Sequence, residues 1–399
     1  MGLAEVTWIG SSTAGCRLLF GPLAAISVDK LGFKATGCIG SALTTISMVV
    51  CYFSTSFALF AASYGGLMGL AFAFLYFPGT TCNVFYFREK IGLANGIVYS
   101  TAGVGKTAWS LAYSYIGEAF GLDGVLILNG IVALHLILPI CMFHPNVDHA
   151  NERMAASSAR RLSSMDKSTL DSGSVTVSKY ELFKSPVIWL FSLGAFFMGG
   201  GDAAALVFVP EIGSSLPNVT VRQKDMLMTY LGISSIFARV VVGWVSDTKN
   251  SFAIWGMGCL GSGLCCIIYP FLHSYFMMAI FTSILGFFIA AYISTTALAA
   301  LQLFGIEQVN LACGMLHFCA GIGAFAIPPL IGYLFEFQLP ASSITLVPCM
   351  GLCGVFVLAF LFFVLATIAQ RKRDHRRIWW FMPATVVRRM SVFSTKQSK

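Results

Sequence analysis

The sequence predicts an all-α membrane protein made of two related helical bundles. Three observations support this prediction: the apolar composition, a series of apolar segments long enough to cross a bilayer, and a motif that recurs along the chain. Hydrophobic residues fill 57% of the 399 positions and charged residues only 11%, whereas soluble domains carry about 25% charged residues. A bilayer solvates that much apolar surface and water does not.

Eleven apolar segments each approach the length of about 20 residues that a transmembrane helix needs. In chain order they cover residues 6–28, 35–53, 57–80, 95–120, 125–143, 186–209, 226–246, 252–272, 275–296, 308–334 and 344–369. Some contain proline, which bundled membrane helices tolerate. The segments do not alternate between polar and apolar residues as the strands of a membrane barrel do.

The basic residues predict which loops face the cytoplasm. If alternate loops are assigned to that side, they and the C-terminal tail hold 20 of the 25 Lys and Arg residues, as the positive-inside rule requires. The opposite loops hold only Arg222 and Lys224. A glycosylation sequon at Asn218 lies in one of these opposite loops, although a single sequon also occurs by chance. We therefore expect a multi-pass protein with a cytoplasmic C-terminus.

The count of spans and the polar segments set the expected organisation. Eleven spans with a cytoplasmic C-terminus place Met1 outside without a signal peptide, so we expect that a first helix, of twelve in all, is missing. A Ser- and Arg-rich segment separates five spans from six. The expected parts are an N-terminal bundle (1–143), a cytoplasmic linker (144–185), a C-terminal bundle (186–370) and a basic cytoplasmic tail (371–399).

A recurring motif relates the two bundles. The spacing L-A-x-G-x6-G-x-G begins at Leu93 and again at Leu311, a displacement of 218 residues. Separately, Arg17-x3-Gly recurs at Arg239, a displacement of 222 residues, and each helix then ends near an aspartate. Duplicated halves are typical of transporters whose binding site lies between them near the bilayer midplane. Because no nucleophile cluster or metal-ligand spacing is present, we expect neither an enzyme nor a bound metal or cofactor.

Four segments resemble the monocarboxylate transporter family of the major facilitator superfamily. Residues 66–105 are similar to that family's helix 4–5 signature, GLMGLAFAFLYFPGTTCNVFYFREKIGLANGIVYSTAGVG. Residues 303–336 are similar to its helix 11, including the PP-x2-G end, and residues 180–191 to the start of its helix 7. The segment GPLAAISVDKLGFK from Gly21 resembles the superfamily's helix 2–3 loop. The resemblance implies a plasma-membrane carrier of small carboxylates, usually a proton symporter, and in some members of aromatic amino acids, thyroid hormones or creatine.

Basic residues inside the predicted spans are candidate substrate-binding residues, because an ionisable group in lipid is costly and faces the protein interior or a cavity. The planar guanidinium of Arg239 suits bidentate binding of a carboxylate, and the resemblance places the family's substrate arginine here. The alternative is a structural arginine bound to a helix carbonyl or an interfacial phosphate. Lys106 and Arg17 lie deep in their spans; each either adds positive charge near the substrate or forms a structural ion pair.

Asp202 and His317 are the candidates for proton coupling. The resemblance places Ser235 where proton-coupled members carry an aspartate, four residues before Arg239. Asp202 could bind the proton instead if burial raised its pKa, or it could pair with a basic residue. His317 could relay a proton or serve only as hydrogen-bonded packing.

Five charged residues at predicted cytoplasmic helix ends are candidates for gating or structural ion pairs. They are Asp29, Lys34, Arg88, Glu89 and Asp247. In the superfamily such groups join helices and hold the outward-open state. Ordinary positive-inside charge would also explain Lys34 and Arg88.

The main hypothesis is a transporter of small monocarboxylates that works by alternating access, with proton coupling to be tested. One alternative is a carrier of another organic anion or of aromatic amino acids. The other is a transport-inactive paralogue or truncated isoform that acts as a receptor or scaffold. The expected partners are a small organic anion, protons, the lipid bilayer and a single-pass accessory subunit. Nucleic acid is not expected, because the positive charge lies in short loops between apolar segments.

Overall fold

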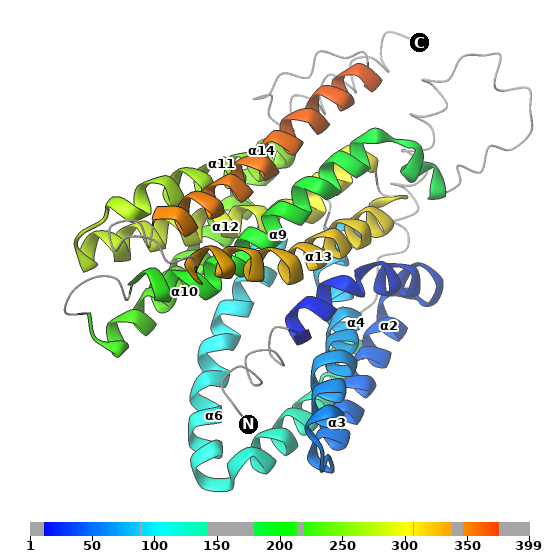
Figure 1. Cartoon of the computed structure of the whole chain (residues 1–399). Helices are drawn as coiled ribbons and strands as arrows, with labels where there is room; N and C mark the ends of the chain where they lie inside the picture. The colour runs from blue at the N-terminus through cyan, green and yellow to red at the C-terminus, as the bar shows by residue number, and fades with distance from the viewer. Residues whose placement is uncertain are drawn as a thin grey trace, which may run out of the picture.

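A computed structural model of the chain describes residues 12–87, 90–142, 179–213, 219–305, 307–336 and 346–374. All regular elements in these segments are helices (Figure 1). Nine helices of the described part are long and apolar enough to cross a membrane. The predicted all-α membrane protein is therefore confirmed. Asn218, Arg88, Glu89, most of the expected linker and the expected tail beyond Asp374 lie outside the described residues.

The N-terminal half, as we call residues 12–142, begins with a helical segment at 12–19 that leads into α2 (Gly21–Tyr52). The next path across the bilayer is assembled from α3 (Phe57–Ala61), the π-helical turn η1 (Ala62–Leu67), α4 (Met68–Thr81) and α5 (Asn83–Tyr86). The half ends with α6 (Ile91–His135) and α7 (Ile137–Cys141). The hydroxyl of Ser56 accepts a hydrogen bond from the Leu59 backbone N–H and so begins α3.

Two glycines reverse the chain inside α2 and α6. Gly32 has a φ of 84° and Gly121 a φ of 66°, values that glycine adopts without the strain a Cβ would cause. Each glycine divides its helix into two arms, at 21–31 and 33–52 in α2 and at 91–120 and 122–135 in α6. The loops predicted at these two places are thus reduced to tight turns. The predicted segments 6–28 and 95–120 do not appear as separate spans among the nine membrane-crossing helices of the described part.

The C-terminal half, residues 179–374, starts with the 3-10 turn η3 (Lys179–Lys184), which occupies the end of the expected linker. It continues through α9 (Pro186–Gly213), α10 (Val221–Thr248), α11 (Ser251–Ile268), η4 (Tyr269–Phe271), α12 (Tyr275–Phe304), α13 (Val309–Glu336) and α14 (Leu346–Asp374). A capping box between Thr220 and Gln223 begins α10 ahead of the predicted span. α12 continues to Phe304, past its predicted end at residue 296.

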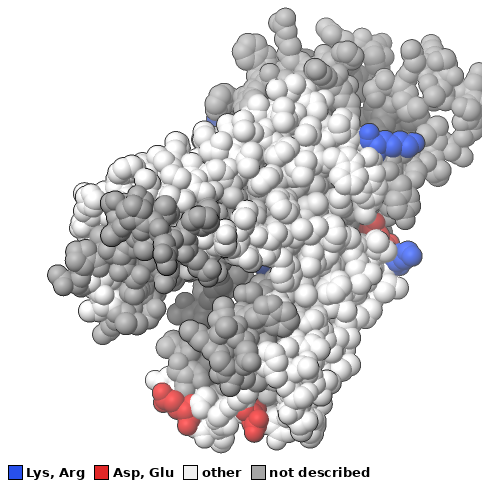
Figure 2. Space-filling model, in the orientation of Figure 1, with Lys and Arg blue, Asp and Glu red and all other residues white. Residues whose placement is uncertain are grey.

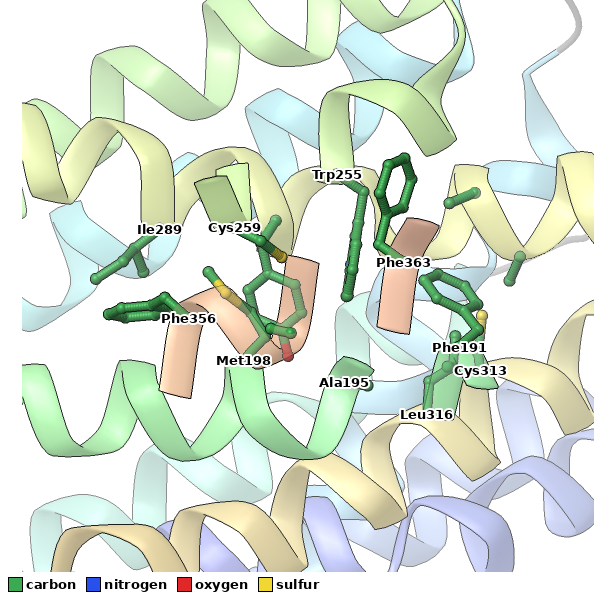
Figure 3. Close-up of a cluster of buried hydrophobic side chains, with 14 of the residues drawn as sticks. Phe191, Ala195, Met198, Trp255, Cys259, Ile289, Cys313, Leu316, Phe356 and Phe363 are labelled. Atoms are coloured by element: carbon green, nitrogen blue, oxygen red, sulfur yellow. The ribbon is translucent and has the colours of Figure 1, made fainter. Parts of the chain in front are cut away.

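Aromatic side chains fill the interior of the C-terminal half (Figure 3). Phe191, Trp255 and Phe363 come from α9, α11 and α14 and are almost completely buried. The ring centroids of Phe191 and Trp255 lie 4.9 Å apart, and those of Trp255 and Phe363 lie 6.2 Å apart. Tight packing of large rings holds these helices together where lipid offers no hydrophobic driving force.

Glycines let the two halves approach each other backbone to backbone. Where α6 meets α10, a Cβ on Gly243 would lie 2.9 Å from the Cα of Gly96. Where the first arm of α2 meets α13, a Cβ on Gly314 would lie 2.8 Å from the Cβ of Ala25. The sequence repeat relates these two contacts, because it matches the first arm of α2 with α10 and the first arm of α6 with α13.

Both contacts lie toward the same end of the bundle, which we call the charged end. Asp29, Lys34, Lys90, Asp247 and Lys249 mark it, since they lie at or beside the helix ends where the chain turns. The wide face of the molecule in Figure 2 is almost free of charged side chains, as a lipid-facing surface requires. From the charged end, α6 and α10 leave their contact in different directions (Figure 1).

Substitution of Gly243 with leucine tests the close contact between α6 and α10. The added side chain meets the backbone of Gly92 and Gly96, and overpacking of this kind costs roughly 1–3 kcal/mol. We expect Gly243→Leu to lower the melting temperature of the detergent-solubilised protein by several degrees, measured by fluorescence-detected size exclusion after heating. Gly232→Leu in the same helix is the control, because no described atom lies within 4 Å of its Cβ position. Equal melting temperatures for the two variants would contradict the contact.

Candidate functional site

Tyr76 of α4 lies at the centre of a group of polar and aromatic side chains drawn from both halves. The guanidinium carbon of Arg17 stands 4.4 Å from the centroid of its ring. The rings of Tyr99 from α6 and His317 from α13 meet Tyr76 edge-on, with centroids 6.3 and 5.7 Å away. Together with Arg239, which binds Tyr99, these residues are called the central cluster.

Arg239 of α10 joins the central cluster from the other side. Its Nη1 donates a hydrogen bond of 2.8 Å to the backbone carbonyl of Tyr99. Its Nε is buried and has no hydrogen-bond partner among the described residues. A guanidinium carries five N–H donors, and a buried donor without an acceptor is costly. The Nε–H group of Arg239 therefore has no acceptor among the described residues, whereas its Nη1 is bound to the N-terminal half.

Arg17 has an aromatic partner. It is half-buried in the helical segment at 12–19, where the negative face of the Tyr76 ring stabilises its charge. Neither Arg17 nor Arg239 forms an ion pair with a described carboxylate. The structural ion pair was one of two roles expected for Arg17, and the described part of the chain contains no such pair.

His317 and Asp202 lie in the neighbourhood of Arg17. The Nδ1 of His317 is 2.7 Å from the carbonyl oxygen of Cys313; a carbonyl only accepts, so Nδ1 carries the hydrogen and Nε2 is left as the second polar atom. Asp202 of α9 is half-buried, and Asp202 and Arg17 both act electrostatically on the hydroxyl of the buried Tyr292. Both predicted proton-coupling residues thus lie on the Arg17 side of the cluster.

Ser235 brings no titratable group to the central cluster. It is buried one helical turn before Arg239, and its hydroxyl donates a 2.8 Å hydrogen bond to the carbonyl of Gly232 in its own helix. Its polar atom is therefore satisfied locally.

Two aspartates connect the halves at the charged end. The carboxylate of Asp247 in α10 accepts hydrogen bonds from the backbone N–H groups of Gly92 (2.6 Å) and Leu93 (3.0 Å) at the start of α6. A carboxylate at a helix N-terminus satisfies unpaired donors and interacts favourably with the helix dipole. Asp29 occupies the repeat-related place, where the side-chain amide of Asn310 at the start of α13 donates to it over 2.8 Å. Each half thus supplies one aspartate to a helix start of the other.

Of the remaining predicted residues, the structure describes the side chain of Lys34 alone. Lys34 is exposed at the charged end. Lys106 lies within α6, but its side chain is outside the described atoms. Arg88 and Glu89 precede α6 and are also not described, so the ion pairs expected of them stay a prediction.

Sequence reasoning missed three tyrosines, Tyr76, Tyr99 and Tyr292. Tyrosine is common in apolar helices, so its presence alone gives no signal. One signal was available for Tyr99: the 218-residue displacement of the L-A-x-G motif matches it with His317. These two repeat-related residues contact the same ring, that of Tyr76.

Neutralising Asp247 tests the connection at the charged end. Asp247→Asn keeps a polar side chain but loses the charge that favours the start of α6, an interaction of roughly 0.3–1 kcal/mol. The halves should then separate more often, and the native Cys313, which is buried in α13 one turn before His317, should react with N-ethylmaleimide about two- to fivefold faster. Mass spectrometry of the labelled peptides measures both rates. Cys259, buried within the C-terminal half, is the control for general unfolding and should stay unreactive; unchanged labelling of Cys313 would count against the connection.

Comparisons with known proteins agree with this architecture. The family model for the Major Facilitator Superfamily matches residues 1–274 and, in an overlapping match, residues 191–393. Monocarboxylate transporter 12 of Xenopus laevis is 24% identical over 345 residues, which cover 84% of this chain and 75% of the relative. Monocarboxylate transporter 9 of Gallus gallus is 22% identical over 419 residues, which cover 84% and 80%.

Solved structures share the fold at low sequence identity. A variant of the Escherichia coli fucose:proton symporter FucP superposes with a TM-score of 0.67 at 14% identity and covers 91% of each chain. FucP in the outward conformation gives 0.65 at 12% identity, covering 92% of this chain and 91% of its own. The human organic anion transporter MFSD10 gives 0.63 at 15% identity, covering 89% and 83%. The chain belongs to the Major Facilitator Superfamily, is homologous to the monocarboxylate transporters, and is a membrane transporter in fold and family rather than an enzyme.

Proposed function

We propose that this protein carries small organic anions, monocarboxylates first among them, across the plasma membrane by alternating access. The observation that carries the proposal is Arg239, whose buried Nε has no described acceptor while its Nη1 binds the Tyr99 carbonyl. A carboxylate offers two oxygens in the geometry that a guanidinium binds bidentately. Arg17 adds a second positive charge without a described carboxylate partner. The names of the relatives support the same substrate class.

The bond between Arg239 and Tyr99 suggests how binding is linked to movement. The arginine belongs to the C-terminal half and the carbonyl to the N-terminal half. A bound carboxylate competes with that carbonyl for the guanidinium and so weakens a contact that holds the halves together. A ligand shifts a conformational equilibrium only through such a difference in its interactions with the two states.

We assign the structure to the outward-facing state of this cycle, with its C-terminus in the cytoplasm. Close contacts and hydrogen bonds join the halves at the charged end, and the distribution of Lys and Arg supports a cytoplasmic position for that end. The likeness to FucP in the outward conformation supports the same assignment. In this state Asp247 and Asp29 hold the two halves together on the cytoplasmic side.

Proton coupling belongs to the same proposal. Asp202 and His317 are described titratable groups that act electrostatically on, or directly contact, the tyrosines around Arg17. Lys106 lies two turns beyond Tyr99 in α6 and is proposed as a further positive charge along the substrate path. A proton taken up at Asp202 or His317 would offset the charge of an entering anion.

Uptake into proteoliposomes tests the proposed function. Labelled lactate, pyruvate and phenylalanine are offered with and without an inward proton gradient. We expect saturable uptake of a carboxylate that the gradient stimulates, and Asp202→Asn or His317→Gln should remove the stimulation. If correctly folded protein takes up none of these anions, the receptor or scaffold alternative is favoured.

Replacement of Arg239 by lysine separates charge from geometry. Arg239→Lys keeps the positive charge but loses the planar fork that binds two oxygens. The KM for the transported anion should rise about tenfold, as measured by initial rates of uptake. Lys249→Gln, which removes an exposed positive charge at the end of α10, is the matched control and should leave KM unchanged.

Two substitutions of Tyr76 test the contact between its ring and Arg17. Tyr76→Phe keeps an aromatic face for the guanidinium, whereas Tyr76→Leu removes a cation–π interaction of about 0.5–2 kcal/mol. We expect uptake to be nearly normal in the first variant and reduced roughly threefold or more in the second. Similar losses in both would instead assign the effect to the tyrosine hydroxyl.

A further inference from the structure

The second arm of α2 runs antiparallel to the last helices of the N-terminal half, and hydrogen bonds fix their register. Thr45 donates a 3.4 Å hydrogen bond to the carbonyl of Gly130 in α6. One turn nearer the charged end, Ser41 donates to the carbonyl of Ala133. The pairing therefore moves toward the start of this arm of α2 as it moves toward the end of α6.

The same register brings two cysteines together near the charged end. A Cβ on Gly37 would lie 3.0 Å from the Cγ2 of Ile140 in α7. The residue that follows each of these two is a cysteine, and the thiols of Cys38 and Cys141 form a side-chain hydrogen-bonding contact. Both thiols are free, and Cys38 is half-buried whereas Cys141 is exposed. One thiol of the pair is thus open to a reagent while the other lies beside it.

A basic residue lies near this pair. Lys34 is exposed one helical turn before Cys38 and acts electrostatically on its thiol. A nearby ammonium group stabilises a thiolate, which is the form of cysteine that reacts as a nucleophile. Oxidant-sensitive cysteines commonly have an accessible thiol next to a second, resolving cysteine, and Cys141 and Cys38 have this arrangement.

We propose that Cys38 and Cys141 are a modification site at which hydrogen peroxide forms a reversible disulfide. The thiolate of Cys141 attacks one peroxide oxygen; the O–O bond breaks, the sulfur becomes a sulfenic acid, and the hydroxide that leaves takes up the thiol proton as water. The thiolate of Cys38 then attacks that sulfur, forms the S–S bond and releases the second water. Two thiols lose two electrons, and one peroxide gains them.

Thiol–disulfide exchange with two molecules of a small thiol such as glutathione restores both cysteines and leaves the small thiol as its disulfide. In the orientation proposed above, the pair faces the cytoplasm, where such thiols keep cysteines reduced. The disulfide then forms only when peroxide rises. It would tie the second arm of α2 to the end of α7 and close a loop of roughly 100 residues, which stabilises a protein by restricting its unfolded chain.

Peroxide treatment of the purified full-length protein in detergent tests the site without any substrate, so the result does not depend on transport. After treatment, free thiols are blocked with N-ethylmaleimide and the digested protein is analysed by mass spectrometry. We expect the peptides of Cys38 and Cys141 to be linked about tenfold more than in untreated protein. The melting temperature should rise by about 3–6 °C, and dithiothreitol should reverse both changes.

Single variants decide the order of the steps and the specificity of the site. Cys38→Ser should leave Cys141 as a sulfenic acid that dimedone labels, and it should abolish the rise in melting temperature. Cys319→Ser, at a half-buried cysteine of α13, is the matched control and should keep both the link and the rise. Elution of each variant as a single symmetric peak confirms that it is folded.

Two outcomes would overturn the proposal. One is full alkylation of Cys38 and Cys141 after peroxide treatment that oxidises other cysteines of the chain. The other is a Cys141 disulfide between two copies of the chain, seen as a dimer on a non-reducing gel, because the exposed thiol would then react without its neighbour.

Discussion

The structure depends on the close approach of two pairs of helices at one end of the bundle. Side chains are nearly absent from these contacts, since Gly96 faces Gly243 and Gly314 faces Ala25. In a bilayer such contacts are stabilised by van der Waals packing and by polar groups that find partners across the interface. Asp247 and Asn310 supply these polar bonds at the helix starts. The positions of the central cluster follow from this arrangement, because its members come from helices that the contacts bring together.

The cost of charge in an apolar medium explains the make-up of the central cluster. Each arginine uses a partner other than a carboxylate: the ring of Tyr76 for Arg17 and the Tyr99 carbonyl for Arg239. Such partners reduce the cost of burying the guanidinium without neutralising it. The two guanidinium groups of the cluster therefore keep their positive charge without a direct carboxylate partner among the described residues.

Much of the architecture could be predicted from residue patterns. Apolar segments predicted the helices, because a bilayer span needs about 20 apolar residues whatever the neighbouring helices are. The repeat predicted that the first arm of α2 and α10 occupy equivalent places, and Asp29 and Asp247, 218 residues apart, each bind a helix start of the other half. Helix boundaries were less predictable. Gly32 and Gly121 turn the chain within what were expected to be loops, since a single residue with positive φ can replace a longer connection.

The site was only partly predictable. Charged residues within apolar segments identified Arg17, Arg239, Asp202 and His317, because their burial is costly enough to single them out. Tyr76, Tyr99 and Tyr292 carry no such cost and gave no signal. Their role depends on which rings and carbonyls lie near the arginines, and that is set by helix rotation and crossing. The bond from Arg239 to the Tyr99 carbonyl is a contact with a backbone atom, which no residue pattern encodes.

The sequence by itself determined the helical membrane fold, the duplication and the positions of the buried charges, because each follows from the transfer of residues between water and lipid. Only the tertiary structure decided where the two halves meet and which partner each arginine has. These features arise from contacts between residues far apart in the chain, such as Asp247 with Leu93 and Gly323 with Phe196, and their geometry depends on how whole helices pack.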